Sequence, residues 1–156
     1  MMKSAPYISI VWPAFLDLMS YLGRKLGFLE ITIWGLTLGW LVISREPMDE
    51  ETERHESVHV CQLLELSILT SLASLVAFWS PLEIPFWMMV SALVWAWMPG
   101  INPGLMIYSL IWSWQRFALG KSGEQAYEDH PMEVEARIYG SGKYKIEDRP
   151  LFGWLI

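Results

Sequence analysis

Apolar residues fall in long uninterrupted runs along the middle of the chain. Residues 66–82 carry no charged side chain, and the chain carries none again between Glu83 and Arg116. A turn rich in proline and glycine divides this second run into 84–98 and 105–119. Such runs, with tryptophans near the segment ends, are typical of membrane-embedded helices and their interfacial aromatic belts.

The longest predicted helix begins after Pro47, where clustered acidic residues follow the proline. Acids favour a helix N-terminus because they complement its dipole, and no helix breaker follows until Pro81. The pattern predicts a helix over 48–80, which at 1.5 Å per residue is about 50 Å long. Since this exceeds a hydrocarbon core of about 30 Å, we expect its second half to enter the membrane.

The short run 84–98 has 15 residues, which is about 22 Å as a helix and less than a bilayer core. If residues on the two sides of the apolar region meet in one site, the chain must cross the membrane an even number of times. We therefore predict that 84–98 is a re-entrant or short span, and that 66–82 and 105–119 are the crossing pair.

Two segments precede the long helix. Residues 4–22 are mostly apolar and are followed by Arg24 and Lys25, which predicts an interfacial or membrane helix. A helix packed on the body of the protein is the alternative. Residues 29–44 are rich in β-branched and aromatic residues and contain glycines, which favours a strand or hairpin. The edge of such a strand could pair with an extended peptide.

Composition supports lipid as part of the environment. Of 156 residues, 53% are hydrophobic and only 18% are charged, more apolar surface than a small globule can bury. The net charge of −6 argues against a nucleic-acid partner, and Cys61 alone forms no intramolecular disulfide. We expect a mainly α membrane protein with a single domain, residues 1–156.

The sequence His-Glu-x-x-His, from His55 to His59, lies near the start of the long helix. Histidines four residues apart share one helix face and can bind one Zn²⁺, while Glu56 between them can act as general base. The motif predicts a zinc hydrolase, most simply a peptidase. The alternative is two ordinary histidines on an amphipathic helix.

A catalytic zinc site needs a third protein ligand, and the candidates lie near a short helix predicted over 131–139. Glu133 and Glu135 diverge by about 200° on that helix, so only one can face the metal. Both could instead stabilise the helix start, with Glu133 paired to Arg137. His130, just before the first helical proline, is better suited to capping the helix or binding substrate.

Several other polar residues could assist this chemistry. Gln62 lies one turn after His59 and could bind a ligand or the substrate, or be an ordinary surface amide. Glu65 would lie at the rim of the site or support one of its ligands. The candidates for donating a hydrogen bond to the substrate oxyanion are Tyr127, His130 and Tyr139.

These motifs resemble the gluzincin arrangement of integral-membrane heat-shock and prenyl-protein endopeptidases. In those families the third ligand is the Glu three residues before the Ala of E-x-x-A-D. Glu133 stands at that offset before Ala136, and Arg137 replaces the usual Asp. The resemblance implies that His55, His59 and Glu133 hold zinc.

A group of small bacterial membrane proteins is more similar still. The shared motifs are G-x-T-L at 35–38, H-E-x-x-H-x-x-Q-x-x-E at 55–65 and A-Y-x5-E-x-E-A at 126–136. This resemblance covers about two thirds of the chain and is weaker in the apolar runs.

We therefore expect an integral-membrane zinc metallopeptidase that acts on peptides or membrane proteins, with Glu56 as general base. The alternative is a non-catalytic membrane protein with a structural metal site. Basic residues flanking the apolar runs favour a site near the cytoplasmic face of a bacterial inner membrane; they are Arg24, Lys25, Arg45, Arg54, Lys121, Lys143 and Lys145. The sequence does not indicate the oligomeric state.

Overall fold

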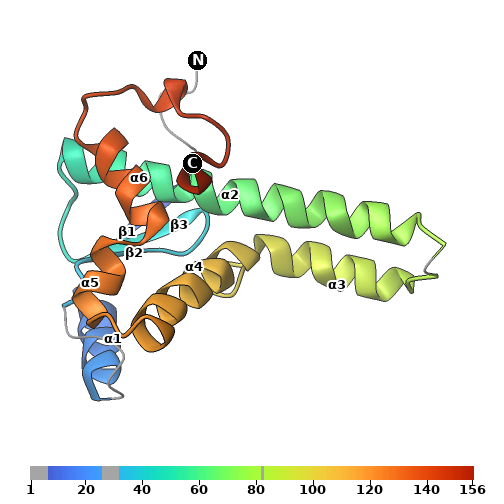
Figure 1. Cartoon of the computed structure of the whole chain (residues 1–156), viewed down its shortest axis with the longest axis horizontal. Helices are drawn as coiled ribbons and strands as arrows, with labels where there is room; N and C mark the ends of the chain where they lie inside the picture. The colour runs from blue at the N-terminus through green and yellow to red at the C-terminus, as the bar shows by residue number, and fades with distance from the viewer. Residues whose placement is uncertain (1–6, 26–31, 82) are drawn as a thin grey trace.

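The computed structural model describes residues 7–25, 32–81 and 83–156. It is mainly helical, with a small sheet and several short helices gathered at one end and a two-helix arm extending from them (Figure 1). The mainly helical fold predicted from the sequence is therefore confirmed, and one element, helix α2, links the two ends of the molecule.

Helix α2 (Glu50–Phe78) is the long helix predicted over 48–80. Asp49 caps it, since its carboxylate accepts a hydrogen bond of 2.8 Å from the backbone N–H of Thr52, and acidic residues fill the first turn. The first half of α2 is buried in the body of the protein, whereas Leu72 and Val76 on the outer half are 55% and 70% exposed.

The arm pairs the outer half of α2 with α3 (Phe86–Trp97). The rings of Phe78 and Phe86 lie 6.2 Å apart at the tip, and the indole N–H of Trp97 donates to the hydroxyl of Ser71 at 3.0 Å. The two helices therefore run antiparallel. Helix α3 therefore starts the return of the chain, and the prediction that 66–82 and 105–119 are the crossing pair stays a prediction.

Helix α4 (Pro103–Ser113) continues this return and ends in a π-helical turn, Trp114–Ala118. Asn102 caps α4 by accepting from the N–H of Leu105 at 3.0 Å. A Cβ at Gly104 would lie 2.4 Å from a methyl of Leu63 and 3.1 Å from its Cα. The absence of a side chain there lets α4 approach the inner half of α2.

This close approach gives a first prediction. Gly104→Ala should lower the unfolding free energy in detergent by about 1–3 kcal/mol, because the added methyl overpacks the contact with Leu63. Ser109→Ala, on an exposed position of the same helix, is the matched control and should stay within about 0.5 kcal/mol of the wild type. Equal thermal denaturation midpoints for both variants would contradict the close packing of α4 on α2.

The sheet has the order β1-β3-β2. Strands β2 (Gly35–Thr37) and β3 (Leu41–Ser44) form an antiparallel hairpin, with Gly35 opposite Ser44. This hairpin confirms the strand prediction for the described part of 29–44, and residues 29–31 lie outside the described residues. One edge of β2 remains unpaired within the sheet.

Strand β1 (Ile8–Val11) pairs with β3 in parallel, with Ile8 opposite Leu41. The prediction of one helix over 4–22 is wrong for this part: residues 8–11 are extended, and helix α1 (Pro13–Lys25) begins at the proline. Two β-branched isoleucines and a valine suit a strand, and pairing with β3 supplies the hydrogen bonds that a helix would otherwise make. Residues 4–6 lie outside the described residues.

The C-terminal third packs on the inner half of α2. Helix α5 (Gly123–Glu128) and helix α6 (Pro131–Gly140) are followed by the 3-10 turns Ile146–Asp148 and Gly153–Leu155. Helix α6 confirms the helix predicted over 131–139. The side chain of Trp154 packs with Leu66 and Met132 in a buried cluster, so the chain end is anchored against α2 and α6.

Among the described residues, α2 is the one helix long and apolar enough to cross a membrane, and α3 is apolar but shorter. The core helix of a soluble protein can have the same length and composition. In α2, however, only 33% of the most apolar 18-residue window is buried inside the protein.

Candidate metal centre

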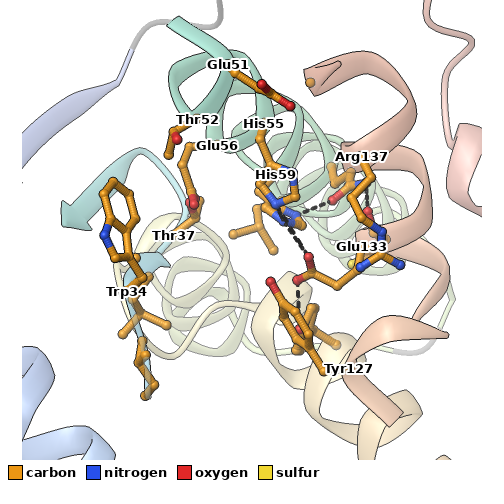
Figure 2. Close-up of a pocket in the computed structure, with 18 of the residues that line it drawn as sticks. Trp34, Thr37, Glu51, Thr52, His55, Glu56, His59, Tyr127, Glu133 and Arg137 are labelled. Carbon is orange, nitrogen blue, oxygen red and sulfur yellow. Dashed lines mark hydrogen bonds and ion pairs between the residues drawn. The ribbon is translucent and has the colours of Figure 1, made fainter. Parts of the chain in front are cut away.

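A cavity of about 830 Å³ opens between β2, the first half of α2, and helices α4, α5 and α6 (Figure 2). Its walls bring together the predicted His-Glu-x-x-His residues, the edge of β2 and the first turn of α6. The polar side chains that face it include Thr37, Glu51, Thr52, His55, Glu56, His59, Gln62, Tyr108, Tyr127, Glu133 and Arg137.

Three of these side chains converge on one point. The Nε2 atoms of His55 and His59 lie 3.1 Å apart, and each lies 3.4 Å from Oε2 of Glu133. Tetrahedral zinc with bonds of about 2.1 Å has ligand atoms about 3.4 Å apart. The spacing of the three atoms therefore fits three corners of a zinc coordination tetrahedron, and the structure brings the three predicted ligands together (Figure 2).

Local packing explains why Glu133 reaches the histidines. Pro131 starts α6 and places Glu133 in its first turn. A Cβ at Gly140, at the other end of the helix, would lie 3.0 Å from the Cβ of His55. Because glycine stands there, α6 can lie directly against α2 and carry its carboxylate to the histidine face.

The chemistry of the donor set also suits a divalent metal. Oε1 of Glu133 accepts a hydrogen bond of 2.9 Å from the hydroxyl of Tyr108, whereas Oε2 is buried without a hydrogen-bond partner among the described residues. Burial raises the pKa of Glu133, but His59 and His55 outweigh it and hold that pKa well below its ordinary value. An ionised carboxylate oxygen thus remains available between two imidazole nitrogens.

Glu56 lies beside this group and outside it. The hydroxyl of Thr37 on β2 donates to Oε2 of Glu56, and a Cβ at Gly35 would lie 3.0 Å from Oε1. Strand β2 therefore fixes the carboxylate at the wall of the cavity, next to the point on which the ligands converge (Figure 2).

The other candidate ligands have different partners. His130 is fully buried and caps α6: its Nδ1 accepts from the N–H of Met132 at 3.2 Å, and its Nε2 lies 3.2 Å from the carbonyl of Tyr108. Burial lowers the pKa of His130 to about 4, which keeps the ring neutral. Glu135 faces away from the histidines and binds Gln62 at 2.8 Å.

The predicted oxyanion donors are now distinguishable. Tyr127 lines the cavity beside Glu133 (Figure 2), and burial raises the pKa of its hydroxyl. Tyr139 instead packs its ring 6.0 Å from that of Tyr144. The alternative pairing of Glu133 with Arg137 is not formed: Arg137 lines the cavity but donates to the backbone carbonyl of Glu128, while Glu133 faces the histidines.

Sequence reasoning missed three residues that hold the site. Thr37 appeared only as a letter of the G-x-T-L motif, and Tyr108 was hidden in an apolar run, although its hydroxyl is unusual there. Arg149 lies in the C-terminal segment and binds Glu65 and Glu135. No pattern in the sequence connects Arg149 to Glu65, which lies 84 positions earlier.

A comparison of the chain with protein-family models, curated proteins and solved structures found no match. The gluzincin resemblance therefore rests on the motif residues alone, and the site is interpreted from its own geometry.

Proposed function

We propose that the protein is a zinc-dependent membrane metallopeptidase. The observation that carries this proposal is the convergence of His55, His59 and Glu133 at tetrahedral spacing, with the carboxylate of Glu56 alongside. Zn²⁺ held there would lower the pKa of water to about 7 and stabilise negative charge on a carbonyl oxygen.

The residues of the chain supply the remaining steps. Glu56 takes a proton from water while the water oxygen bonds to the peptide carbonyl carbon. Glu56 then passes that proton to the leaving amine as the C–N bond breaks. The hydroxyl of Tyr127, which keeps its proton because burial raises its pKa, would donate a hydrogen bond to the carbonyl oxygen. His130 is occupied in capping α6 and leaves this role to Tyr127.

The edge of β2 supports a peptide as substrate. Gly35, Leu36 and Thr37 all line the cavity, and β2 is an edge strand of the sheet. An extended peptide laid along this edge would pair through main-chain hydrogen bonds. Its scissile bond would then lie between the strand and the histidine face of α2.

The surface of the arm supports a bilayer as partner. Large apolar side chains cover its outside; they include Leu72, Val76, Trp79, Phe86, Trp87 and Val94, all at least 55% exposed. A soluble monomer rarely exposes so extensive an apolar surface, so we place the arm in lipid and the substrate at the membrane surface. We further propose that the site lies at the cytoplasmic face of a bacterial inner membrane.

An open site favours catalysis over a structural metal. Structural zinc sites have four protein ligands and are closed, whereas catalytic sites have three and leave a position open. Here three ligand atoms converge at the wall of a cavity of about 830 Å³.

Metal removal tests the proposal. The purified protein in detergent should bind one zinc per chain and hydrolyse an unfolded membrane protein. A zinc chelator should abolish this hydrolysis and added Zn²⁺ should restore it. His59→Ala should lose zinc and hydrolysis together, whereas Glu124→Gln, on the exposed side of α5, should keep both. If the zinc-loaded wild type hydrolyses no peptide substrate, the metal is structural and the proposal fails.

A further inference from the structure

The side of His59 that faces away from the metal site is occupied by Gln62. Nδ1 of His59 lies 2.8 Å from Oε1 of Gln62. The amide nitrogen of Gln62 donates to the carbonyl of Met132 at 3.0 Å and to Oε2 of Glu135 at 2.8 Å. Gln62 is only 1% exposed, so both ends of its amide are held by buried protein groups.

These contacts determine the orientation of the amide and the tautomer of the imidazole. Both partners of the Gln62 amide nitrogen are acceptors, so that nitrogen must be the donor and Oε1 must face His59. An amide oxygen can only accept, so Nδ1 of His59 must carry the proton. In the neutral ring that a metal binds, the lone pair of Nε2 is then directed at Glu133 and His55, where a metal would lie.

The chain of contacts continues to the C-terminal segment. The guanidinium of Arg149 binds Glu135 through Nε at 2.9 Å and through Nη2 at 3.0 Å. It also binds Oε1 of Glu65 at 2.5 Å, and Glu65 accepts from the N–H of Phe152 at 3.1 Å. The side chains of Arg149, Glu65 and Glu135 are 5%, 8% and 6% exposed, so Glu135 has one fixed position against Gln62.

We infer that Gln62, Glu135 and Arg149 form a positioning chain that fixes the Nδ1–H tautomer and the ring orientation of His59, and so sets the zinc affinity of the site. This inference rests on the proposed zinc function. It also assigns Glu135 and the C-terminal segment a role: they keep the Gln62 amide aimed at the histidine. Groups that orient a metal-bound histidine commonly change metal affinity by about 10- to 100-fold when they are replaced.

The decisive variant is Gln62→Leu, which keeps the volume of the side chain and removes the acceptor for Nδ1. Its zinc dissociation constant, measured by competition with a chromophoric chelator, should rise by about 10- to 100-fold. Ser57→Ala is the matched control: Ser57 is also buried on α2 and its hydroxyl bonds the carbonyl of Glu53 at 2.7 Å. That variant loses a buried hydrogen bond but leaves the contacts of the positioning chain intact, so it should bind zinc like the wild type.

The exchange variant Gln62→Glu with Glu135→Gln tests the positioning role itself. It returns an acceptor to Nδ1 of His59 and a donor to the contact between the two side chains, with the total charge unchanged, and leaves the carbonyl of Met132 without its donor. Its zinc affinity should return toward that of the wild type and lie well above that of Gln62→Leu. A merely structural role of Gln62 would predict no such difference in metal affinity between folded variants.

One measurement needs no variant. In the zinc-loaded wild type, ¹⁵N chemical shifts of His59 should show a proton on Nδ1 and coordination through Nε2. Coordination through Nδ1 would overturn the inference. So would a Gln62→Leu variant that binds zinc as tightly as the wild type, or an exchange variant that binds zinc no more tightly than Gln62→Leu. A wild type that binds zinc without hydrolysing peptides would instead refute the proposed function alone, and a wild type that binds no zinc would refute both.

Discussion

Glu56→Gln should bind zinc as the wild type does and hydrolyse peptide bonds about 10²- to 10⁴-fold more slowly, the usual contribution of a general base. The substitution preserves the size and hydrogen-bonding shape of the side chain, and the hydroxyl of Thr37 can still donate to its oxygen. What it removes is the ability to accept a proton from water. Zinc content and the turnover rate at saturating substrate are the two quantities to measure.

Glu51→Gln is the matched control for this variant. Glu51 lines the same cavity and belongs to the same helix, but it is exposed and lies near the cavity mouth. Its replacement should leave turnover within about twofold of the wild type, as expected for a surface charge distant from the reacting atoms. Full activity of Glu56→Gln would refute the assignment of the base, and loss of its zinc would show that Glu56 acts as a ligand.

The largest expected effect on stability is that of Arg149→Met. This substitution leaves the buried carboxylates of Glu65 and Glu135 facing each other without a cation. Removing one partner of a buried ion pair commonly costs about 3–5 kcal/mol, because the remaining charge stays desolvated and unpaired. Chemical denaturation of the detergent-solubilised protein should show a loss of that size.

Arg24→Met provides the comparison. Arg24 is exposed at the end of α1, and its guanidinium lies 3.3 Å from the hydroxyl of Thr32. The same change of residue type should cost less than about 0.5 kcal/mol there, since surface substitutions rarely cost more. Similar small losses for both variants would contradict the interpretation that Arg149 neutralises two buried acids.

Sequence patterns predicted the elements whose signals are local. The acidic first turn and the absence of a breaker before Pro81 predicted α2, and the proline before Glu133 predicted α6. The choice between Glu133 and Glu135 came instead from the resemblance to membrane gluzincins, in which the ligand stands three residues before an Ala. The signals for the two helices lie within a few residues of the elements they describe, so no tertiary information was required for them.

The features that the sequence did not reveal depend on distant partners. Residues 8–11 are extended because β3 pairs with them, and nothing within 4–22 indicates that partner. The packing of α3 on α2 follows from where the chain turns in space, which hydropathy does not encode. Arg149 reached the site through two buried acids, and such a contact has no signature in spacing.

In the proposed peptidase, the length of α2 would set the height of the metal site above the membrane. From His59 to Phe78 the helix rises about 28 Å at 1.5 Å per residue. Its first part as far as Ser67 is buried in the body of the protein, and the exposed part from Ile68 to Phe78 rises about 15 Å, half of a hydrocarbon thickness of about 30 Å. With the arm in lipid, the histidines would therefore lie outside the hydrocarbon at a fixed distance from it, and that distance would decide which bond of a membrane-bound substrate comes level with Glu56.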